Sequence, residues 1–163
     1  MKSARHALPA LLLAFAALLI SACGRQTDSA ATGPAVRAHW LTDFAAAQTQ
    51  AKTENKLVLL DFTGSDWCPW CIKMDQETLD TQPFKDYADA NLVLVELDFP
   101  EHKKLSDAVT QQNHALYDRF NCQGYPTFVV LGPDGSTLNT FVGYQEGGPD
   151  AFIAQLKKLA PKS

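Results

Sequence analysis

The amino-acid sequence predicts an α/β protein in which a mixed sheet of about four strands is flanked by helices. Two apolar segments, Leu57–Phe62 and Leu92–Leu97, have the composition of buried strands, and residues with helical periodicity separate them. Two further β-prone segments, Phe128–Leu131 and Leu138–Val142, are separated only by a turn sequence. Strands joined by a helix are expected to be parallel and strands joined by a tight turn antiparallel, so the sheet should be mixed.

The composition is that of a globular protein and argues against nucleic-acid binding. The chain has 163 residues, of which 46% are hydrophobic and 20% charged, enough for one domain of ordinary size. The formal net charge is −4, and the basic runs are no longer than the pairs Lys103–Lys104 and Lys157–Lys158. Nucleic-acid binding needs a basic surface, which this sequence does not predict.

Residues 1–22 are expected to be an export signal rather than part of the fold. Lys2 and Arg5 form a short basic start, and an apolar stretch rich in Leu and Ala follows from Ala7 to Ile20. This stretch is too short to span a membrane comfortably, and small residues follow it, as in a cleavable signal.

A cysteine placed directly after the signal predicts a lipid anchor. The segment Ile20-Ser21-Ala22-Cys23 resembles the bacterial lipobox, which implies cleavage before Cys23 and attachment of lipid to that residue. Because Gly24 rather than aspartate follows, the resemblance places the protein on the periplasmic face of the outer membrane. Ordinary cleavage near Ala22 and an uncleaved anchor are the alternatives.

A flexible tether is expected to join the anchor to the folded domain. Residues 23–37 are polar or small and contain a Gly-Pro pair, so they cannot bury a core, and the globular domain should span 38–163. From Trp40 onward, apolar residues recur at helical spacing, which predicts a first helix over Thr42–Glu54 with Thr42 as its N-cap.

The remaining helices and the turn follow from periodicity and from Gly and Pro. Helical patterns run over Ile72–Leu79 and Lys104–Phe120, and Pro83 suits the first turn of a helix between them. Gly132-Pro133-Asp134-Gly135 is a turn sequence, and a last helix is expected to open at Gly147-Gly148-Pro149.

Two cysteines between the first buried strand and the next helix predict a redox centre. Cys68 and Cys71 are separated by two residues, and a Cys-x-x-Cys that follows a strand and opens a helix is the sequence form of a dithiol redox site. The first cysteine then lies at the helix N-terminus, where free backbone N–H groups and the helix dipole favour its thiolate. The second lies one turn deeper, close enough to close a disulfide.

The chain resembles the thioredoxin superfamily over about residues 38–160. Four features carry the resemblance in the expected order: Asp61 in the first strand, Trp67-Cys68-Pro69-Trp70-Cys71, Gly124-Tyr125-Pro126-Thr127, and Val142-Gly143. The resemblance implies the thioredoxin fold and thiol–disulfide oxidoreductase activity, with a cis peptide before Pro126 that lies against the disulfide. The sequence around the cysteines is similar to that of exported bacterial thioredoxin-like proteins.

The same resemblance implies roles for individual residues. Cys68 would be the exposed attacking thiol, Cys71 the buried resolving thiol, and Asp61 the acid/base group for Cys71, with a solvated strand-end carboxylate as the alternative for Asp61. Glu96 occupies roughly the position at which thioredoxin has a lysine facing that carboxylate. Substrate contacts are expected from Trp67, Pro69, Trp70, Tyr125, Pro126 and Thr127. Trp67 could instead pack beneath the helix.

The charges near the cysteines favour a reductase or isomerase over a strong oxidant. A strong oxidant stabilises its reduced thiolate, often with a cation beside it. Here no histidine lies between the cysteines, Asp66 and Asp75 are close in sequence, and Lys73 is the nearby cation. A thiol oxidant that donates disulfides is the alternative. An exported reductase needs electrons, so a transmembrane thiol carrier and protein disulfides of the cell envelope are the implied partners.

The sequence is also compatible with two other function classes, and it contains one further thiol. Cys122 is expected to be buried and inert, with a third redox thiol as the alternative. A metal-binding module could draw on Cys68, Cys71, Cys122, His39, His102 and His114. One Cys-x-x-Cys lacks the second ligand pair of a structural zinc site, so no metal and no cofactor are expected. A non-catalytic module stapled by its disulfide is the other alternative.

Overall fold

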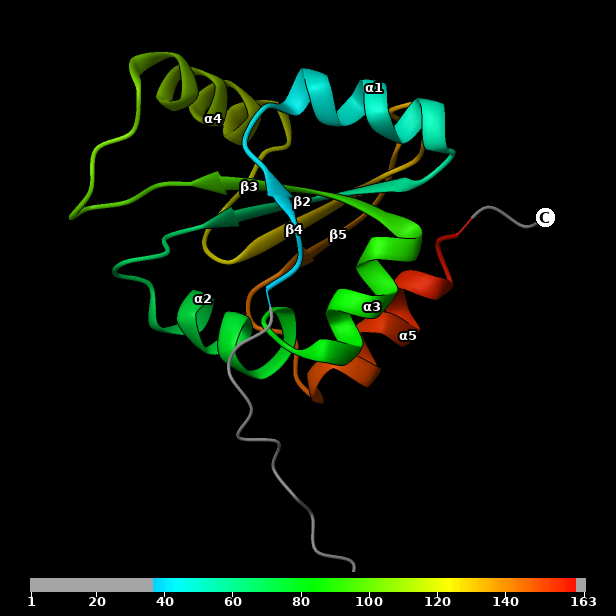
Figure 1. Ribbon diagram of the computed structural model, residues 1–163. Coiled ribbons are helices and arrows are strands. Elements are labelled where there is room, and N and C mark those ends of the chain that lie inside the picture. Colours follow the sequence, from blue (N-terminus) through cyan, green and yellow to red (C-terminus); the bar gives the residue numbers. More distant parts are fainter. Residues whose placement is uncertain (1–36, 161–163) are drawn as a thin grey trace, which may run out of the picture. The chain divides into compact units, whose positions relative to one another are not determined.

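The computed structural model describes residues 37–160 (Figure 1). The expected export signal 1–22, the expected lipidation site Cys23 and nearly all of the expected tether 23–37 lie outside the described residues. The elements follow in the order β1 (Trp40–Leu41), α1 (Phe44–Glu54), β2 (Leu57–Thr63), α2 (Pro69–Met74), the π-helical turn η1 (Asp75–Leu79), α3 (Gln82–Asn91), β3 (Leu92–Asp98), α4 (Asp107–Arg119), β4 (Thr127–Leu131), β5 (Thr137–Val142) and α5 (Gly148–Lys157).

The strands form one mixed sheet, as the sequence predicts. The order across the sheet is β1-β3-β2-β4-β5. The neighbours β1/β3 and β2/β3 are parallel, whereas β2/β4 and β4/β5 are antiparallel. The strands joined by helices are therefore parallel and the strands of the hairpin antiparallel, as expected.

The sheet has five strands rather than about four, and the additional strand is β1, whose two residues fit the helical spacing of the residues that follow. This strand is two residues long, and Trp40 and Leu41 pair with Leu94 and Val95 of β3. Two apolar residues fit helical spacing as well as a strand, so sequence periodicity could not separate the two cases.

Two helix starts also differ from the prediction. The N-cap of α1 is Asp43 rather than Thr42, because the Asp43 carboxylate accepts the backbone N–H of Ala46 at 3.0 Å. Helix α4 begins at Asp107 rather than near Lys104, with the hydroxyl of Ser106 as its cap. In both cases the helix begins after a side chain that can accept a hydrogen bond from a backbone N–H of the first turn.

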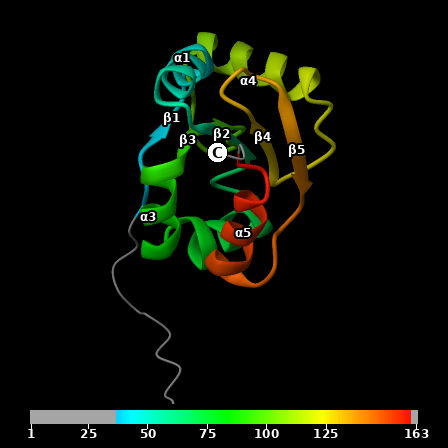
Figure 2. The same ribbon diagram turned by 90° about the vertical axis from the view of Figure 1, so that its right-hand side faces the viewer.

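Helices cover both faces of the sheet (Figures 1 and 2). Helices α1 and α4 lie on one face, and α2, α3 and α5 lie on the other. Along β2, Val58 and Leu60 pack with the α1/α4 side, whereas Leu57 and Leu59 pack with the α3/α5 side. Side chains alternate along a strand, so Asp61 belongs to the face that α2 covers.

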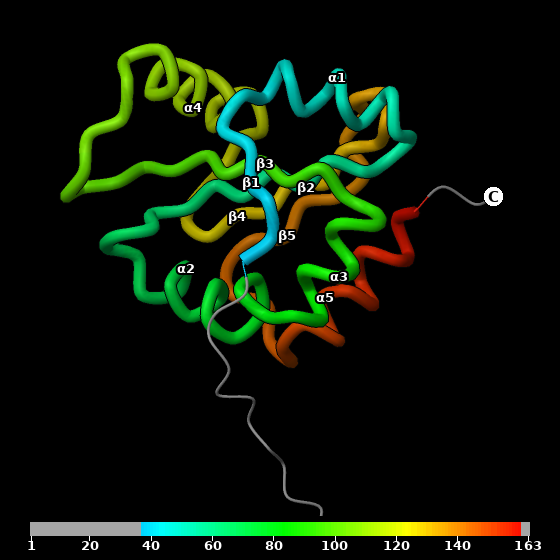
Figure 3. Tube along the Cα trace, in the orientation of Figure 1, coloured from blue at the N-terminus to red at the C-terminus, as the bar shows by residue number. Residues whose placement is uncertain are grey.

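The parallel strands β2 and β3 end at the same edge of the sheet, and the loops that follow them lie there (Figure 3). One loop leads from Thr63 into α2 and carries Cys68, and the other leads from Asp98 to α4. Loops at the carboxyl ends of parallel strands are a common place for functional sites in α/β proteins. Over residues 37–160, the helices are too short or too polar to cross a membrane.

Candidate active site around Cys68 and Cys71

Cys68 and Cys71 form a disulfide at the start of α2. Their Cα atoms are 5.3 Å apart. Cys68 is the N-cap of the helix, and its Sγ accepts the backbone N–H of Cys71 at 3.2 Å, while Pro69 occupies the first turn without needing a donor. With the disulfide closed, Cys68 is 4% and Cys71 1% exposed, so the expected difference in exposure between the two thiols is small.

The loop before Cys68 is fastened to the end of β3. The Gly64 carbonyl accepts the N–H of Cys68 at 2.8 Å, which turns the chain toward the helix. The indole N–H of Trp67 donates to the Phe99 carbonyl at 2.7 Å. The carboxylate of Asp98 accepts both the N–H and the hydroxyl of Ser65, at 3.0 and 2.8 Å. These contacts fix the position of the first cysteine from two strands.

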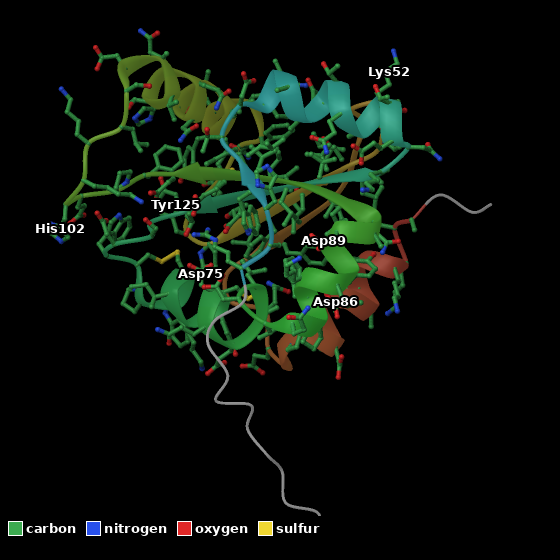
Figure 4. All side chains as sticks on the ribbon, in the orientation of Figure 1. Lys52, Asp75, Asp86, Asp89, His102 and Tyr125 are labelled. Atoms are coloured by element: carbon green, nitrogen blue, oxygen red, sulfur yellow. A yellow bond between two sulfur atoms is a disulfide. The ribbon has the colours of Figure 1, made fainter. Side chains whose placement is uncertain are left out.

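Asp66 is directed to the β3–α4 loop by two hydrogen bonds. Its carboxylate accepts the backbone N–H groups of Glu101 at 2.9 Å and His102 at 2.8 Å. Although burial opposes it, these two N–H donors lower the pKa of the Asp66 carboxyl. His102 lies at the tip of that loop (Figure 4). Asp66 therefore ties the loop before Cys68 to the β3–α4 loop. The spacing of residues in the sequence does not indicate this role.

Aromatic rings line the site on the side of the Tyr125–Pro126 peptide, which is cis as the resemblance implied. The Tyr125 ring lies 5.6 Å from that of Trp67, 5.3 Å from Phe99 and 5.5 Å from Tyr117, centroid to centroid. Burial, with the neighbouring Tyr117, raises the pKa of Tyr125 to about 12, so it is a neutral phenol at physiological pH. Figure 4 shows Tyr125 at the carboxyl end of the sheet. Trp67 belongs to this half-buried wall.

Two residues of the same loop are less open than their expected substrate role implies. Thr127 is 0% exposed, and its hydroxyl donates to the Gly124 carbonyl at 2.7 Å. Pro126 is buried as well, and its carbonyl accepts the N–H of Gly143 at 2.8 Å. A direct contact between either side chain and a substrate would therefore need this loop to move.

Trp70 lies between the two cysteines in the sequence and is 56% exposed. Its ring is 5.8 Å from that of Tyr144, and the Lys73 ammonium lies 4.4 Å from the Tyr144 centroid and 5.5 Å from the Trp70 centroid. Glu77 accepts the Tyr144 hydroxyl. The cation near the cysteines is therefore held over two aromatic rings.

Two acidic side chains on the α2 side of the sheet have raised pKa values. Asp61 is 2% exposed, and its Oδ1 has no hydrogen-bond partner among the described residues. Burial, and then the charges of Asp75 and Glu96, raise the pKa of Asp61 well above its ordinary value. Burial, and then the charge of Asp80, raise the pKa of Asp75 to about 7. Asp75 is thus able to exchange protons near neutral pH, and the neutral form of the buried Asp61 carboxyl is favoured.

Cys122 is buried in the core under α1 and α4, where it is 6% exposed. Burial raises the pKa of its thiol to about 11. The histidines lie apart: His114 packs edge-on against Phe99, and His102 lies in the β3–α4 loop. Within residues 37–160, no three His, Cys, Asp or Glu side chains gather in a way that could hold a metal ion.

Comparison with known proteins agrees with this geometry. A family model for the thioredoxin-like domain matches residues 44–160. The disulfide bond reductase DsbH of Chlamydia pneumoniae is 35% identical over 114 residues, which cover 70% of this chain and 68% of that protein. The thioredoxin-related protein DsbJ of the same organism is 29% identical over 92 residues, 56% of this chain but only 26% of that protein.

Solved structures show the same fold. The DsbH oxidoreductase structure superposes with a TM-score of 0.71 at 34% identity, over 79% of this chain and 90% of that one. The oxidised C-terminal domain of DsbD from Neisseria meningitidis superposes with a TM-score of 0.54 at 26% identity, over 76% and 98%. With a Cys-x-x-Cys disulfide at the start of α2 in this fold, the chain is a thiol–disulfide oxidoreductase that belongs to the thioredoxin-like domain family.

Proposed function

We propose that this oxidoreductase works as a disulfide reductase or isomerase of the cell envelope, with Cys68 as the attacking and Cys71 as the resolving cysteine. The observation that carries the assignment of the two thiols is the hydrogen bond from the Cys71 N–H to the Cys68 Sγ at 3.2 Å. A backbone donor aimed at that sulfur favours its thiolate once the disulfide is reduced. Cys71 lies one turn deeper in the helix, which suits the resolving role, although the two cysteines differ little in exposure while the disulfide is closed.

The proposed reaction is two successive thiol–disulfide exchanges. The Cys68 thiolate attacks one sulfur of a substrate disulfide, forming a mixed disulfide and releasing the other substrate sulfur as a thiolate. Cys71 then loses its proton and attacks the Cys68 sulfur, which closes the Cys68–Cys71 disulfide and releases the second substrate thiolate. The substrate gains two electrons and the enzyme loses two.

Asp61 is the proposed acid/base group for the second step. It lies on the face of the sheet that α2 covers, it is buried, and its raised pKa makes the carboxylate a stronger proton acceptor than an exposed aspartate. If the role is right, Asp61→Asn should slow resolution of the mixed disulfide while leaving the first attack by Cys68 nearly unchanged. Single-turnover kinetics with a chromogenic disulfide would separate the two steps.

The charges around the disulfide support the reducing direction. Asp66 and Asp75 place acidic groups on both sides of the cysteines, and Lys73 is held over the rings of Trp70 and Tyr144. Acidic neighbours oppose the thiolate, so the reduced form is stabilised less than in a strong oxidant. The 35% identity to a protein named as a disulfide bond reductase supports the same direction. A thiol oxidant is the alternative.

Substrates are proposed to dock across Trp67, Pro69, Trp70 and Tyr125, beside Pro126 and Thr127, whose side chains are buried in this structure. Trp70 and Pro69 are exposed beside the disulfide, and Tyr125 forms part of the aromatic wall on the other side. An exposed tryptophan and a wall of rings fit apolar segments around the disulfide of an incompletely folded protein.

The location in the cell is proposed from the N-terminal sequence. An export signal over 1–22 and a lipid on Cys23 would hold the domain at the membrane, on the periplasmic face of the outer membrane, through the tether. Electrons would then reach Cys68 from a transmembrane thiol carrier. Cys23→Ala should move the full-length protein from the membrane to the soluble fraction of cells and abolish incorporation of labelled fatty acid.

Reduction of insulin disulfides tests the proposed function. We expect the wild-type chain to reduce insulin with dithiothreitol as electron source, Cys68→Ser to be inactive, and Cys71→Ser to accumulate mixed disulfides on Cys68. Titration against glutathione should give a potential near the reducing end of the span of about −270 to −120 mV of related centres. A potential near −120 mV would favour the oxidant, and an inert wild type would favour a non-catalytic module.

A further inference from the structure

Four carboxylates converge on the face of the sheet that α2 covers. Asp61 on β2 and Glu96 on β3 are register partners in neighbouring parallel strands, so their side chains point to the same face. Asp75 and Asp80 come from η1 and from the residue that ends it. The raised pKa of Asp61 has Asp75 and Glu96 among its causes, and that of Asp75 has Asp80 and Glu96, so the four charges act on one another.

Arg37 brings a positive charge into this carboxylate group. Its guanidinium donates to Glu96 Oε1 at 2.6 Å, and its Nε lies 3.8 Å from Asp80 Oδ1. Arg37 also opposes the rise in the pKa of Asp61 and of Asp75. Over residues 37–160, no other salt bridge reaches any of the four carboxylates.

The edge strand β1 holds Arg37 in place. Trp40 pairs with Leu94 of β3, and Ala38, the residue after Arg37, is buried in the core on the same face of the sheet as Leu59 and Leu94. The Arg37 guanidinium also lies 5.8 Å from the centre of the Trp40 ring. The side chain is therefore fixed by two acids and an aromatic ring although almost half of it remains exposed.

We propose that Arg37, through its contacts with Glu96 and Asp80, is the counter-charge of this carboxylate group and thereby sets the pH at which Cys71 resolves the mixed disulfide. Arg37 acts through other residues and touches no reacting atom, so it is a positioning residue. The proposal rests on the proposed role of the buried carboxyls in resolution, which Asp75 shares because it lies one helical turn after Cys71.

The chemistry follows from the balance of protons in the resolving step. The Cys71 thiol must give its proton to a base before its sulfur attacks Cys68, and a carboxyl that is already protonated cannot take it. The charged groups acting on this base come from four elements: Asp61 on β2, Glu96 and Asp98 on β3, Asp75 and Asp80 from the η1 region, and Arg37 before β1. Lys103 pairs with Asp98 at 2.7 Å, but without Arg37 the other acids have no cation paired with them within residues 37–160, so the base holds its proton to higher pH.

Carboxyl titration in the oxidised protein tests the electrostatic half of the proposal without any turnover. In wild type and Arg37→Gln labelled at aspartate carboxyl carbons, NMR titration should show the Asp61 and Asp75 transitions displaced upward by roughly 0.5 pH unit or more in the variant. In Arg37→Lys, which keeps the positive charge, both transitions should lie near their wild-type positions. Glu96→Gln added to Arg37→Gln restores the net charge of the group and should move both transitions back.

The pH profile of mixed-disulfide resolution tests the catalytic half. Arg37→Gln should displace the rising limb upward by the same roughly 0.5 pH unit, which is about a threefold loss of rate below that limb and none above it. Arg119→Gln is the matched control, because Arg119 also stacks on aromatic rings, 5.7 Å from Phe44 and 5.1 Å from Phe120. It should leave the profile in place.

The results distinguish a failure of the Arg37 proposal from a failure of the proposed reductase or isomerase function. Unmoved carboxyl titrations in Arg37→Gln would overturn the proposal, as would moved titrations with an unmoved profile. A uniform loss of rate at every pH would also overturn it, since a merely structural role for Arg37 gives that result. A wild type that reduces no disulfide would refute the proposed function, yet the NMR titration would still report whether Arg37 controls the two carboxyls.

Discussion

The indole N–H of Trp67 donates to the backbone carbonyl of Phe99 at 2.7 Å, so the residue before the first active-site cysteine is fastened to the residue that follows β3. Trp67→Phe keeps a ring against Tyr125 but removes this donor. We expect a loss of about 1 kcal/mol in the free energy of unfolding, measured by urea denaturation. Trp70→Phe changes an exposed ring and should stay within about 0.5 kcal/mol of wild type. Equal losses would contradict the prediction.

Gly64 has no room for a side chain. A Cβ at this position would lie 2.5 Å from Cε2 and 2.7 Å from Nε1 of Trp67. In Gly64→Ala the indole must therefore move and give up its bond to Phe99, and we expect a loss of about 1–3 kcal/mol together with altered tryptophan fluorescence. Gly124→Ala is the control, because its added Cβ meets nothing within 4 Å. An unchanged melting temperature in Gly64→Ala would show that Trp67 moves freely.

Asp75 should make stability depend on pH in a defined direction. Its pKa is about 7 in the folded protein against 3.8 for an ordinary aspartate, so the folded state binds the proton more tightly than the unfolded state. Stability is therefore unaffected below pH 3.8 and is lost as pH rises from 3.8 through 7. Asp75→Asn should equal wild type near pH 4 and exceed it by about 4 kcal/mol at pH 8, since each pKa unit corresponds to about 1.4 kcal/mol.

Urea unfolding of the oxidised protein at the two pH values measures this difference. Asp118→Asn, on the exposed side of α4, should give the same difference from wild type at both pH values. A gain in Asp75→Asn that is equally large at pH 4 would point to packing rather than to the buried charge.

The Cys122 thiol should be unreactive toward alkylating reagents in the native protein. Its thiol is 6% exposed and has a pKa of about 11, so at pH 8 only about one molecule in a thousand carries the reactive thiolate. Iodoacetamide should label the oxidised protein over hours, as slowly as the fold opens, and Cys122→Ala should reduce insulin at the wild-type rate. Labelling within minutes, or loss of activity, would instead make Cys122 a third redox thiol.

Trp70 should matter for protein substrates and not for small ones. Its exposed ring, supported by Tyr144 and Lys73, offers a contact that only an extended chain around a disulfide can use. We expect Trp70→Ala to raise KM for insulin about three- to tenfold and to leave the rate with oxidised glutathione unchanged. Equal losses of activity with insulin and with oxidised glutathione would contradict this prediction, because they would mean that Trp70 affects the reactivity of the Cys68–Cys71 disulfide rather than the binding of the chain.

The sequence was sufficient for the fold and for the two cysteines because both depend on local signals. The buried strands are continuous apolar runs, and the redox pair is a short motif at a strand-to-helix junction, with Pro126 in the predicted loop far along the chain. Strand β1 escaped prediction because a two-residue strand has no periodicity of its own and exists only through its pairing with β3.

The parts of the site that escaped prediction depend on tertiary contacts. Asp66 and Asp98 are ordinary acids in the sequence, and their hydrogen bonds to Glu101, His102 and Ser65 appear only once two loops meet. Arg37 was assigned to the tether, yet its guanidinium contacts Glu96, 59 residues away. No local pattern distinguishes a tether arginine from one that completes a buried charge group.

The disulfide links residues only three apart in the sequence. A cross-link this short restricts the unfolded chain by about 2 kcal/mol, against almost 5 for a loop of 100 residues, so opening it frees little of the polypeptide. The stabilities of the oxidised and reduced folds should therefore differ mainly through the interactions that the folded protein makes with the disulfide or with the two thiols. By the thermodynamic cycle of folding and reduction, the melting temperatures of the two forms and the affinity of the protein for electrons then report the same free-energy difference, and each can be used to check the other.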